Sequence, residues 1–132
     1  MDDLGYDLKS ALKIIDEIVN ELEVEGKFKR LCSGKLIRSG GQIMAMALGA
    51  DAVYTARGFL LALGCIQALR CHTNNCPTGI TTHNPRLMKG LDIEKKSERV
   101  KNYALHILKY NYELLGALGL KSFSELKPEH VI

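Results

Sequence analysis

Long apolar runs are missing from this 132-residue chain, and no stretch approaches the roughly 20 residues that a membrane-spanning helix needs. The first residues are acidic and lack a charged-then-apolar leader, so no secretion signal is expected. The formal net charge is only +3, and the lysines are scattered along the chain rather than gathered on one stretch. These absences predict a cytoplasmic protein that binds neither membranes nor nucleic acid.

Linkers, internal repeats and low-complexity segments are also missing. Because 46% of the residues are apolar, a chain of this length can bury a real core as one domain. It contains four cysteines. In a chain that is not secreted, cysteines indicate metal sites, redox groups or buried thiols rather than a framework of disulfides.

Three of the cysteines are concentrated in one short stretch. Cys65, Cys71 and Cys76 follow the spacing C-x5-C-x4-C, and Pro77 then forces a turn. Deprotonated sulfur is a ligand for zinc and for iron–sulfur clusters. The pair C-x2-C with which structural zinc sites usually begin is absent, and Cys32 lies far upstream. The spacing therefore favours an iron–sulfur cluster with one unoccupied corner.

Two other interpretations of the cysteines stay open. Zinc could take His72 or His83 as a fourth ligand beside the thiols, or the cysteines could form disulfides or remain unreactive. Each histidine on its own is better explained as a hydrogen-bonded structural residue.

Secondary structure is indicated by periodicity and by capping residues. The expected elements are a helix over 7–23, a strand over 28–33, a helix over 42–48, a strand over 51–55 and an apolar helix from 59 to about 69. Asp7 is the expected N-cap of the first helix, and Gly26 and Gly49 mark the ends of the first two. Cys65 is expected near the end of the third helix. This order predicts parallel strands joined by right-handed crossovers.

The C-terminal half is expected to be helical after an irregular stretch over 77–85. The longest helix should cover 92–118, with Asp92 as its N-cap and Gly119 at its end. The run from Ser122 to Glu125 matches a capping box for a final short helix.

A glycine-rich loop separates the first expected strand from the helix after it. Ser33, Gly34 and Lys35 open this loop, and Gly40 and Gly41 close it. Such a loop exposes backbone N–H groups and the positive end of a helix dipole, which suits a phosphate group. Loops of this kind also occur for purely geometric reasons, so the pattern alone leaves both interpretations open.

The stretch from Ala62 to Ile80 resembles the cluster segment in the FMN-binding (central) domain of the glutamate synthase large subunit family. The resemblance implies a 3Fe-4S cluster on Cys65, Cys71 and Cys76, without Cys32. Residues 28–58 are similar to the last strands of that family's barrel.

The same resemblance implies a site for the FMN phosphate, formed by Ser33, Gly34, Lys35, Gly40, Gly41, Ala56 and Arg57. Many related barrels have a second glycine where this chain has Lys35. Lys35 and Arg57 could each hold the phosphate or point into solvent.

The resemblance implies an α/β fold: the C-terminal portion of a (β/α)8 (TIM) barrel, with an iron–sulfur loop and C-terminal helices. Residues 1–132 would form one partial domain, with barrel units over 1–61, the cluster loop over 62–85 and helices over 86–132. A closed barrel takes about 250 residues, so the chain should be inactive alone and no residue is predicted to be catalytic.

The implied activity is glutamate formation from 2-oxoglutarate and ammonia or glutamine, with electrons passing between the cluster and FMN. An upstream barrel polypeptide or a homo-oligomer is the expected partner. The alternatives are a non-catalytic metal-binding or electron-transfer module, a structural subunit that completes a split barrel, and a truncated remnant of the enzyme.

Overall fold

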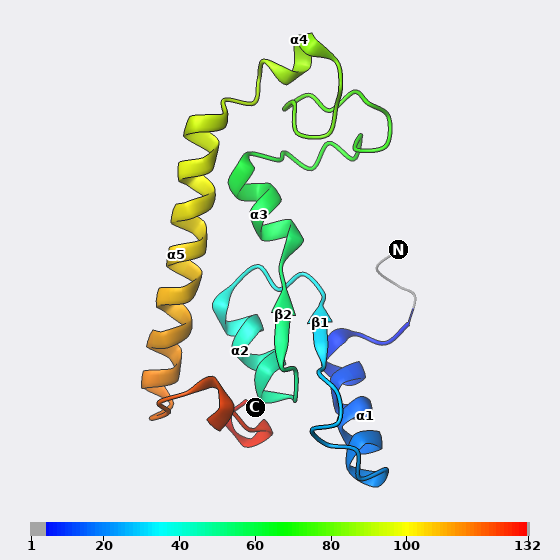
Figure 1. The fold of residues 1–132 in the computed structure, drawn as a ribbon, viewed down its shortest axis with the longest axis vertical. Coiled ribbons are helices and arrows are strands. Elements are labelled where there is room, and N and C mark those ends of the chain that lie inside the picture. Colours follow the sequence, from blue (N-terminus) through cyan, green and yellow to red (C-terminus); the bar gives the residue numbers. More distant parts are fainter. Residues whose placement is uncertain (1–4, 132) are drawn as a thin grey trace. The chain divides into compact units, whose positions relative to one another are not determined.

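The computed structural model describes residues 5–131 (Figure 1). The chain consists of two compact units. The first unit takes in the chain up to Thr55 and from Leu108 onward, and the second is Ala56–Ile107. Helices and one small parallel sheet make up the secondary structure, which agrees with the predicted α/β class.

Helix α1, Leu8–Glu21, opens the first unit, and Asp7 is its N-cap as predicted. Oδ1 of Asp7 accepts hydrogen bonds from the backbone N–H groups of Lys9 and Ser10, at 3.0 and 3.1 Å. The helix ends before the predicted Gly26, because Glu23 already adopts a left-handed conformation with φ of 53°.

Strands β1, Leu31–Ser33, and β2, Ala52–Tyr54, pair in parallel, as the order of elements predicted. In their register Cys32 lies opposite Val53. Both strands are shorter than predicted, and just before them the Arg30 carbonyl accepts hydrogen bonds from the amides of Asp51 and Ala52 at 2.9 and 3.3 Å. The Asp51 carboxylate accepts a hydrogen bond from the backbone N–H of Arg30 at 2.8 Å.

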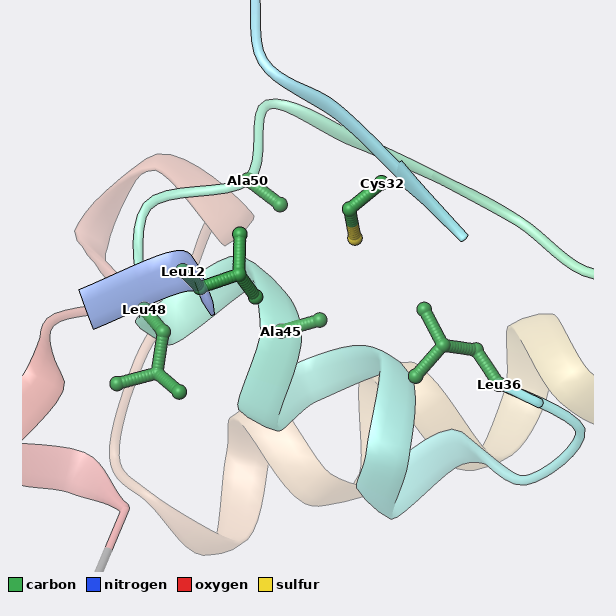
Figure 2. Close-up of a cluster of buried hydrophobic side chains, with 6 residues drawn as sticks. All are labelled: Leu12, Cys32, Leu36, Ala45, Leu48 and Ala50. Atoms are coloured by element: carbon green, nitrogen blue, oxygen red, sulfur yellow. The ribbon is translucent and has the colours of Figure 1, made fainter. Parts of the chain in front are cut away.

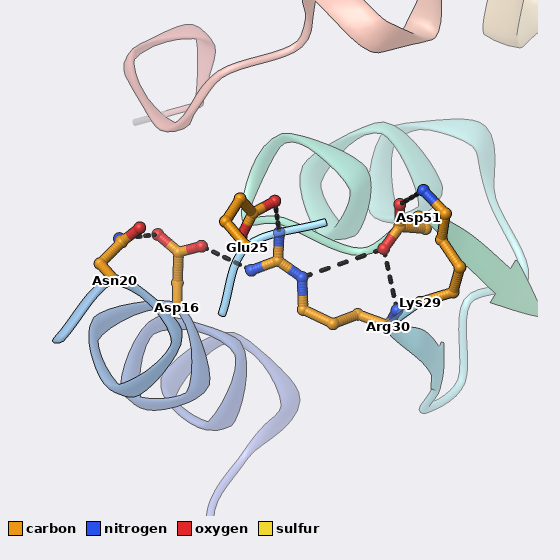
Figure 3. A network of polar contacts seen from close by, with 6 residues as sticks. All are labelled: Asp16, Asn20, Glu25, Lys29, Arg30 and Asp51. Carbon is orange, nitrogen blue, oxygen red and sulfur yellow. Dashed lines mark hydrogen bonds and ion pairs between the residues drawn. The ribbon is translucent and has the colours of Figure 1, made fainter. Parts of the chain in front are cut away.

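The Arg30 guanidinium is the centre of a polar network just before the two strands (Figure 3). It lies 2.7 Å from an oxygen of Asp16, 3.1 Å from Glu25 and 4.0 Å from Asp51, while Lys29 binds the second oxygen of Asp51 at 2.9 Å. The Arg30 side chain is only 14% exposed, so these ion pairs are partly shielded from water. They tie α1 to the loops that lead into β1 and β2.

Helix α2, Ser39–Ala47, begins three residues earlier than predicted, so Gly40 and Gly41 lie in its first turn instead of preceding it. Gly49 ends the helix as predicted, with φ of +98°. A Cβ added at Gly49 would lie 2.8 Å from Nη1 of Arg30, so the glycine also makes room for the polar network.

The core of the first unit lies between α1, β1 and α2 (Figure 2). Its buried members are Leu12, Cys32, Leu36, Ala45, Leu48 and Ala50. Burial raises the pKa of the Cys32 thiol, so it remains protonated at neutral pH. Cys32 is therefore a core residue.

Helix α3, Ala56–Leu63, opens the second unit and differs from the prediction at both ends. It starts three residues earlier and stops at Leu63, so Cys65 lies beyond the helix rather than near its end. The stop is made by Gly64, whose φ of +100° breaks the helical conformation. The Cys65 amide then donates to the Leu60 carbonyl at 2.9 Å, which closes the last turn.

Helix α4, Pro85–Met88, was not predicted, although it carries a recognisable start. The Asn84 side chain accepts a hydrogen bond from the Arg86 amide, and Pro85 occupies the first helical position. Residues 64–84 contain neither helix nor strand, so the irregular stretch predicted over 77–85 begins earlier than expected and ends one residue sooner, at the start of α4.

Helix α5, Ile93–Ala117, confirms the longest predicted helix to within a residue at each end. Oδ1 of Asp92 accepts from the Lys95 amide at 3.1 Å, and Gly119 has a φ of +75°. None of the described helices, α5 included, is long and apolar enough to cross a membrane.

Two short 3-10 helices follow α5: η1, Phe123–Glu125, and η2, Pro128–His130. The predicted capping box is only half formed. Ser122 accepts from the Ser124 amide, but the Glu125 carboxylate reaches the amide of Lys121 instead of that of Ser122.

Candidate cofactor site

The segment between α3 and α4 holds the three clustered cysteines and is unusually rich in left-handed backbone. Gln67, Leu69 and Asn74 have φ of 56°, 56° and 59°, a conformation that costs energy for residues other than glycine. Backbone strain of this kind concentrates at functional sites. The local backbone therefore marks the same segment that the cysteine spacing singled out.

Hydrogen bonds lower the pKa of the Cys76 thiol strongly. A hydrogen bond of 3.3 Å joins its Sγ to the Thr78 hydroxyl. This contact, followed by a hydrogen bond from the Thr81 backbone N–H, lowers the pKa of the Cys76 thiol to about 6. The side chain is buried. At neutral pH Cys76 is therefore mainly a thiolate, the form that binds metal.

The other two thiols occupy more open positions. Cys65 is half-buried, and its Sγ accepts a hydrogen bond from the Gln67 amide at 3.4 Å. Cys71 is exposed at the start of a turn. Both lie on the same irregular segment as Cys76, but in different environments.

The three thiols do not meet in this conformation. In residues 5–131, no three side chains of histidine, cysteine, aspartate or glutamate gather as metal ligands. The imidazoles of His72 and His83 are exposed, and His83 is held through its backbone, whose N–H donates to the Asn74 side chain at 2.6 Å. The ligand set of Cys65, Cys71 and Cys76 thus stays a prediction.

The chemistry of the donor set nevertheless fits an iron–sulfur cluster. One thiol is biased towards the thiolate, and the sulfur atoms of Cys65 and Cys76 already receive backbone or hydroxyl hydrogen bonds. Donors of this kind around sulfur ligands are the groups that adjust a cluster's reduction potential.

The predicted phosphate loop begins where β1 ends. Gly34 has a packing role that the sequence did not reveal, since a Cβ added there would lie 3.1 Å from Cδ2 of Leu8 in α1. Lys35 has a φ of 58°, the left-handed conformation that glycine adopts without strain. This conformation explains why a glycine suits the Lys35 position.

The N-terminus of α2 is open to an anion. Its N-cap, Arg38, makes no side-chain capping hydrogen bond. Gly40 and Gly41 hold the second and third positions of the helix, and a Cβ added at Gly40 would meet no described atom within 4 Å. Amides of the first helical turn, without a side-chain cap, attract negative charge.

The start of α3 also has features that suit a polar ligand. Ala56 and Arg57 are its first two residues and are exposed. Just before them, the Thr55 hydroxyl is buried and has no hydrogen-bond partner among the described residues. An unpaired buried hydroxyl at a helix start fits a polar ligand group.

Comparison with known proteins identifies the class. Residues 1–121 match the model of the conserved region in glutamate synthase. The chain belongs to the glutamate synthase family, as the stretch from Ala62 to Ile80 predicted.

Individual relatives agree with this assignment. The chain is 39% identical to the glutamate synthase large subunit-like protein YerD of Bacillus subtilis, over 99% of this chain and 25% of the relative. It is 36% identical to the archaeal glutamate synthase [NADPH] of Methanocaldococcus jannaschii, over 96% of this chain and 25% of the relative. It is also 37% identical to the glutamate synthase [NADPH] large chain of Bacillus subtilis, over 70% of this chain and 6% of the relative.

The chain thus spans about a quarter of the length of the first two relatives. No solved structure matches it.

Proposed function

We propose that this chain supplies the flavin-phosphate loops and the iron–sulfur loop of a cytoplasmic glutamate synthase-type oxidoreductase. The observation that carries the proposal is Cys76. Its Sγ lies 3.3 Å from the Thr78 hydroxyl, a contact that lowers the pKa of the thiol, and it is the last cysteine of a C-x5-C-x4-C segment in a chain of the glutamate synthase family.

Cys65, Cys71 and Cys76 would hold a 3Fe-4S cluster. Cys76 enters the site with little cost of deprotonation, because Thr78 and Thr81 stabilise its thiolate through hydrogen bonds. Cys71, which is exposed, is free to approach as the loop closes around the cluster. The Gln67 amide remains next to the sulfur of Cys65.

The FMN phosphate is proposed to bind at the start of α2, where the amides of Gly40 and Gly41 have no side-chain cap from Arg38. Ala56 and Arg57, the first residues of α3, are proposed as further ligands on the family resemblance alone. Ser33, Gly34 and Lys35 would complete the cradle, with the Lys35 ammonium adding positive charge. Thr55 joins this set through its unpaired hydroxyl.

When bound, the flavin and the cluster supply the redox chemistry that forms glutamate from 2-oxoglutarate and ammonia. The residues of this chain bind and orient these groups, and none of them is proposed as an acid or a base. The chain is proposed to need further barrel segments for turnover.

We propose that further strands of a (β/α)8 barrel, supplied by a barrel segment outside the described residues, pair with β1. Among the described strands, β1 pairs only with β2, so its other edge has unpaired backbone groups. An apolar pocket beside that strand is lined by Leu8, Ile15, Phe28 and Leu31, among others. A neighbouring strand would cover both the edge and the pocket.

The test is the iron, acid-labile sulfide, zinc and flavin content of the anaerobically purified chain, with its electron paramagnetic resonance spectrum. Iron and sulfide in a ratio near three to four, with a three-iron signal, are expected. A Cys71→Ser variant should lose the iron. Cys32→Ala is the matched control, because Cys32 lies in the core of the other unit, and it should keep the iron.

A colourless protein with one bound zinc would instead support a non-catalytic metal-binding module. If Cys71→Ser kept its full metal content, the proposed ligand set would be wrong. Co-expression with a barrel polypeptide should add flavin to the purified complex, and a homo-oligomer that binds no such partner would contradict the partner proposal.

A further inference from the structure

Two buried amide side chains link α2 to α5 within the first unit. Gln42 and Asn111 are 3% and 7% exposed, and Nδ2 of Asn111 donates to Oε1 of Gln42 at 3.0 Å. Nε2 of Gln42 in turn donates to the backbone carbonyl of Leu36 at 3.1 Å. A chain of two hydrogen bonds therefore runs from α5, through α2, to the loop between β1 and α2.

The Leu36 carbonyl determines which atoms are donors and which are acceptors in these two hydrogen bonds. A backbone carbonyl can only accept, so the amide nitrogen of Gln42 must face Leu36 and its oxygen must face Asn111. Asn111 must then present its nitrogen, which leaves its oxygen buried and without a partner among the described residues. Two apolar side chains would avoid the cost of the unpaired Asn111 oxygen but would leave the Leu36 carbonyl without its donor. The amide pair therefore serves to hold the Leu36 carbonyl.

Leu36 lies in a strained turn of the loop between β1 and α2. The preceding residue, Lys35, has the unfavourable φ of 58°, and its carbonyl accepts from the Ile37 amide at 2.8 Å in a tight turn. The Leu36 side chain is buried in the core, and a Cβ added at Gly41 would lie 3.5 Å from its Cδ2. Holding the Leu36 carbonyl therefore fixes the strained turn against the first turn of α2.

We propose that Gln42 and Asn111 are positioning residues for the phosphate cradle. They act through Leu36: the hydrogen-bond chain keeps residues 34–38 and the amides of Gly40 and Gly41 in a shape that accepts a phosphate group. This inference rests on the proposed binding of a flavin phosphate at that loop. It adds α5, a distant part of the sequence, to the elements that determine affinity there.

The test is a titration of the ¹⁵N-labelled full chain with inorganic phosphate, with chloride at the same ionic strength as the reference. The amide signals of Gly34, Gly40 and Gly41 report binding. Two variants are compared with the wild type, Gln42→Met and the double variant Gln42→Met with Asn111→Leu. The midpoint of thermal unfolding is measured for each protein.

A purely structural role and a positioning role predict different results for the double variant. The double variant removes the buried amide pair and the unpaired Asn111 oxygen but leaves the Leu36 carbonyl without its donor, so its thermal midpoint should lie above that of the single variant. Its phosphate affinity should nevertheless fall at least about tenfold, because a misplaced binding group loses affinity even in a stable fold. The single variant should lose both stability and affinity.

Leu12→Ala is the matched control for stability, since Leu12 lies in the core of the same unit and takes part in neither of the two hydrogen bonds. It should lower the thermal midpoint and leave phosphate affinity unchanged below the transition. If the double variant does not fold, Asn111→Leu alone is the test variant. It removes the donor to Gln42, so its phosphate affinity should fall at least about threefold.

The outcomes separate the inference from the proposed function. Wild-type affinity in a folded double variant, or in Asn111→Leu, overturns the positioning role and leaves the phosphate site intact. A wild-type chain whose glycine signals do not respond to phosphate overturns the proposed site and the inference with it.

Discussion

Gly79 lies against the backbone of Leu87: a Cβ added at Gly79 would be 2.6 Å from the Leu87 carbonyl oxygen. This close approach joins the irregular segment after Cys76 to α4. Gly79 also has a φ of +76°, which other residues adopt only with strain. The position thus requires glycine for two independent reasons.

Gly79→Ala should destabilise the second unit by about 2 kcal/mol or more, because it adds left-handed strain to a steric clash with backbone. Hydrogen exchange of residues 64–90 and the thermal midpoint of unfolding measure the effect. Gly116→Ala in α5 is the control. A Cβ added there meets no described atom within 4 Å, so the change should be neutral or stabilise by up to about 1 kcal/mol. Equal effects of the two changes would contradict the close approach.

Asp51 should make the stability of the first unit depend on pH in the acid range. Its pKa is lowered, first by the hydrogen bond from the Arg30 backbone N–H and then by the Lys29 side chain. Because the pKa is lower in the folded state, the carboxylate stabilises the fold fully above its unfolded pKa of about 3.9. That contribution is lost as the pH falls further, through the lowered pKa.

Asp51→Asn should therefore cost about 1 kcal/mol at pH 7 and progressively less below about pH 4. Chemical denaturation at a series of pH values measures this difference. A variant curve that stays parallel to the wild type down to the acid limit would show that Asp51 does not titrate with a lowered pKa.

Lys35→Gly, compared with Lys35→Gln, should separate the effect of backbone strain at this position from the effect of the side chain's charge. Glycine adopts the φ of 58° freely, so the free energy of unfolding should rise by up to about 1 kcal/mol. If the Lys35 ammonium contributes to the proposed phosphate site, phosphate affinity should fall in the same variant. Lys35→Gln keeps the strain and removes the charge, so it should lose affinity without gaining stability. Unchanged affinity in both would show that Lys35 points into solvent.

Thr78→Val should raise the pKa of the Cys76 thiol, because the Thr78 hydroxyl is the largest cause of its depression. In metal-free protein, the pH at which Cys76 reacts half-maximally with iodoacetamide should move from near 6 towards the ordinary thiol value, about 8.5. Mass spectrometry of the peptide that contains Cys76 measures the profile. Cys71 serves as the internal reference, and a profile for Cys76 that does not move would contradict the role of Thr78.

Elements whose ends depend on local chemistry were predictable from the sequence. Asp7 and Asp92 cap the helices that follow them, and Gly49 and Gly119 end theirs, because capping and left-handed glycine act within a single turn. The parallel pairing of β1 and β2 followed from the order of elements. Family membership followed from one short stretch of sequence.

Features that depend on tertiary surroundings were not predictable in the same way. The apolar residues Ile66 and Leu69 suggested that α3 continues, but they are 65% and 83% exposed, and apolar periodicity cannot tell buried from exposed positions. Gly64 was the overlooked signal. The contact between Gln42 and Asn111 joins residues 69 positions apart, and no local pattern reveals it.

The closeness of the three cysteines in sequence has a consequence for assembly. Binding a common metal centre would close loops of only five and four intervening residues. The entropy lost in closing a loop grows with its length, so these closures are among the least demanding that a chain can make. Cys65, Cys71 and Cys76 also lie in one unit, while the core around Cys32 lies in the other. Assembly of the proposed cluster on this segment would therefore be a local event in kinetic terms, and it could proceed before long-range contacts have formed.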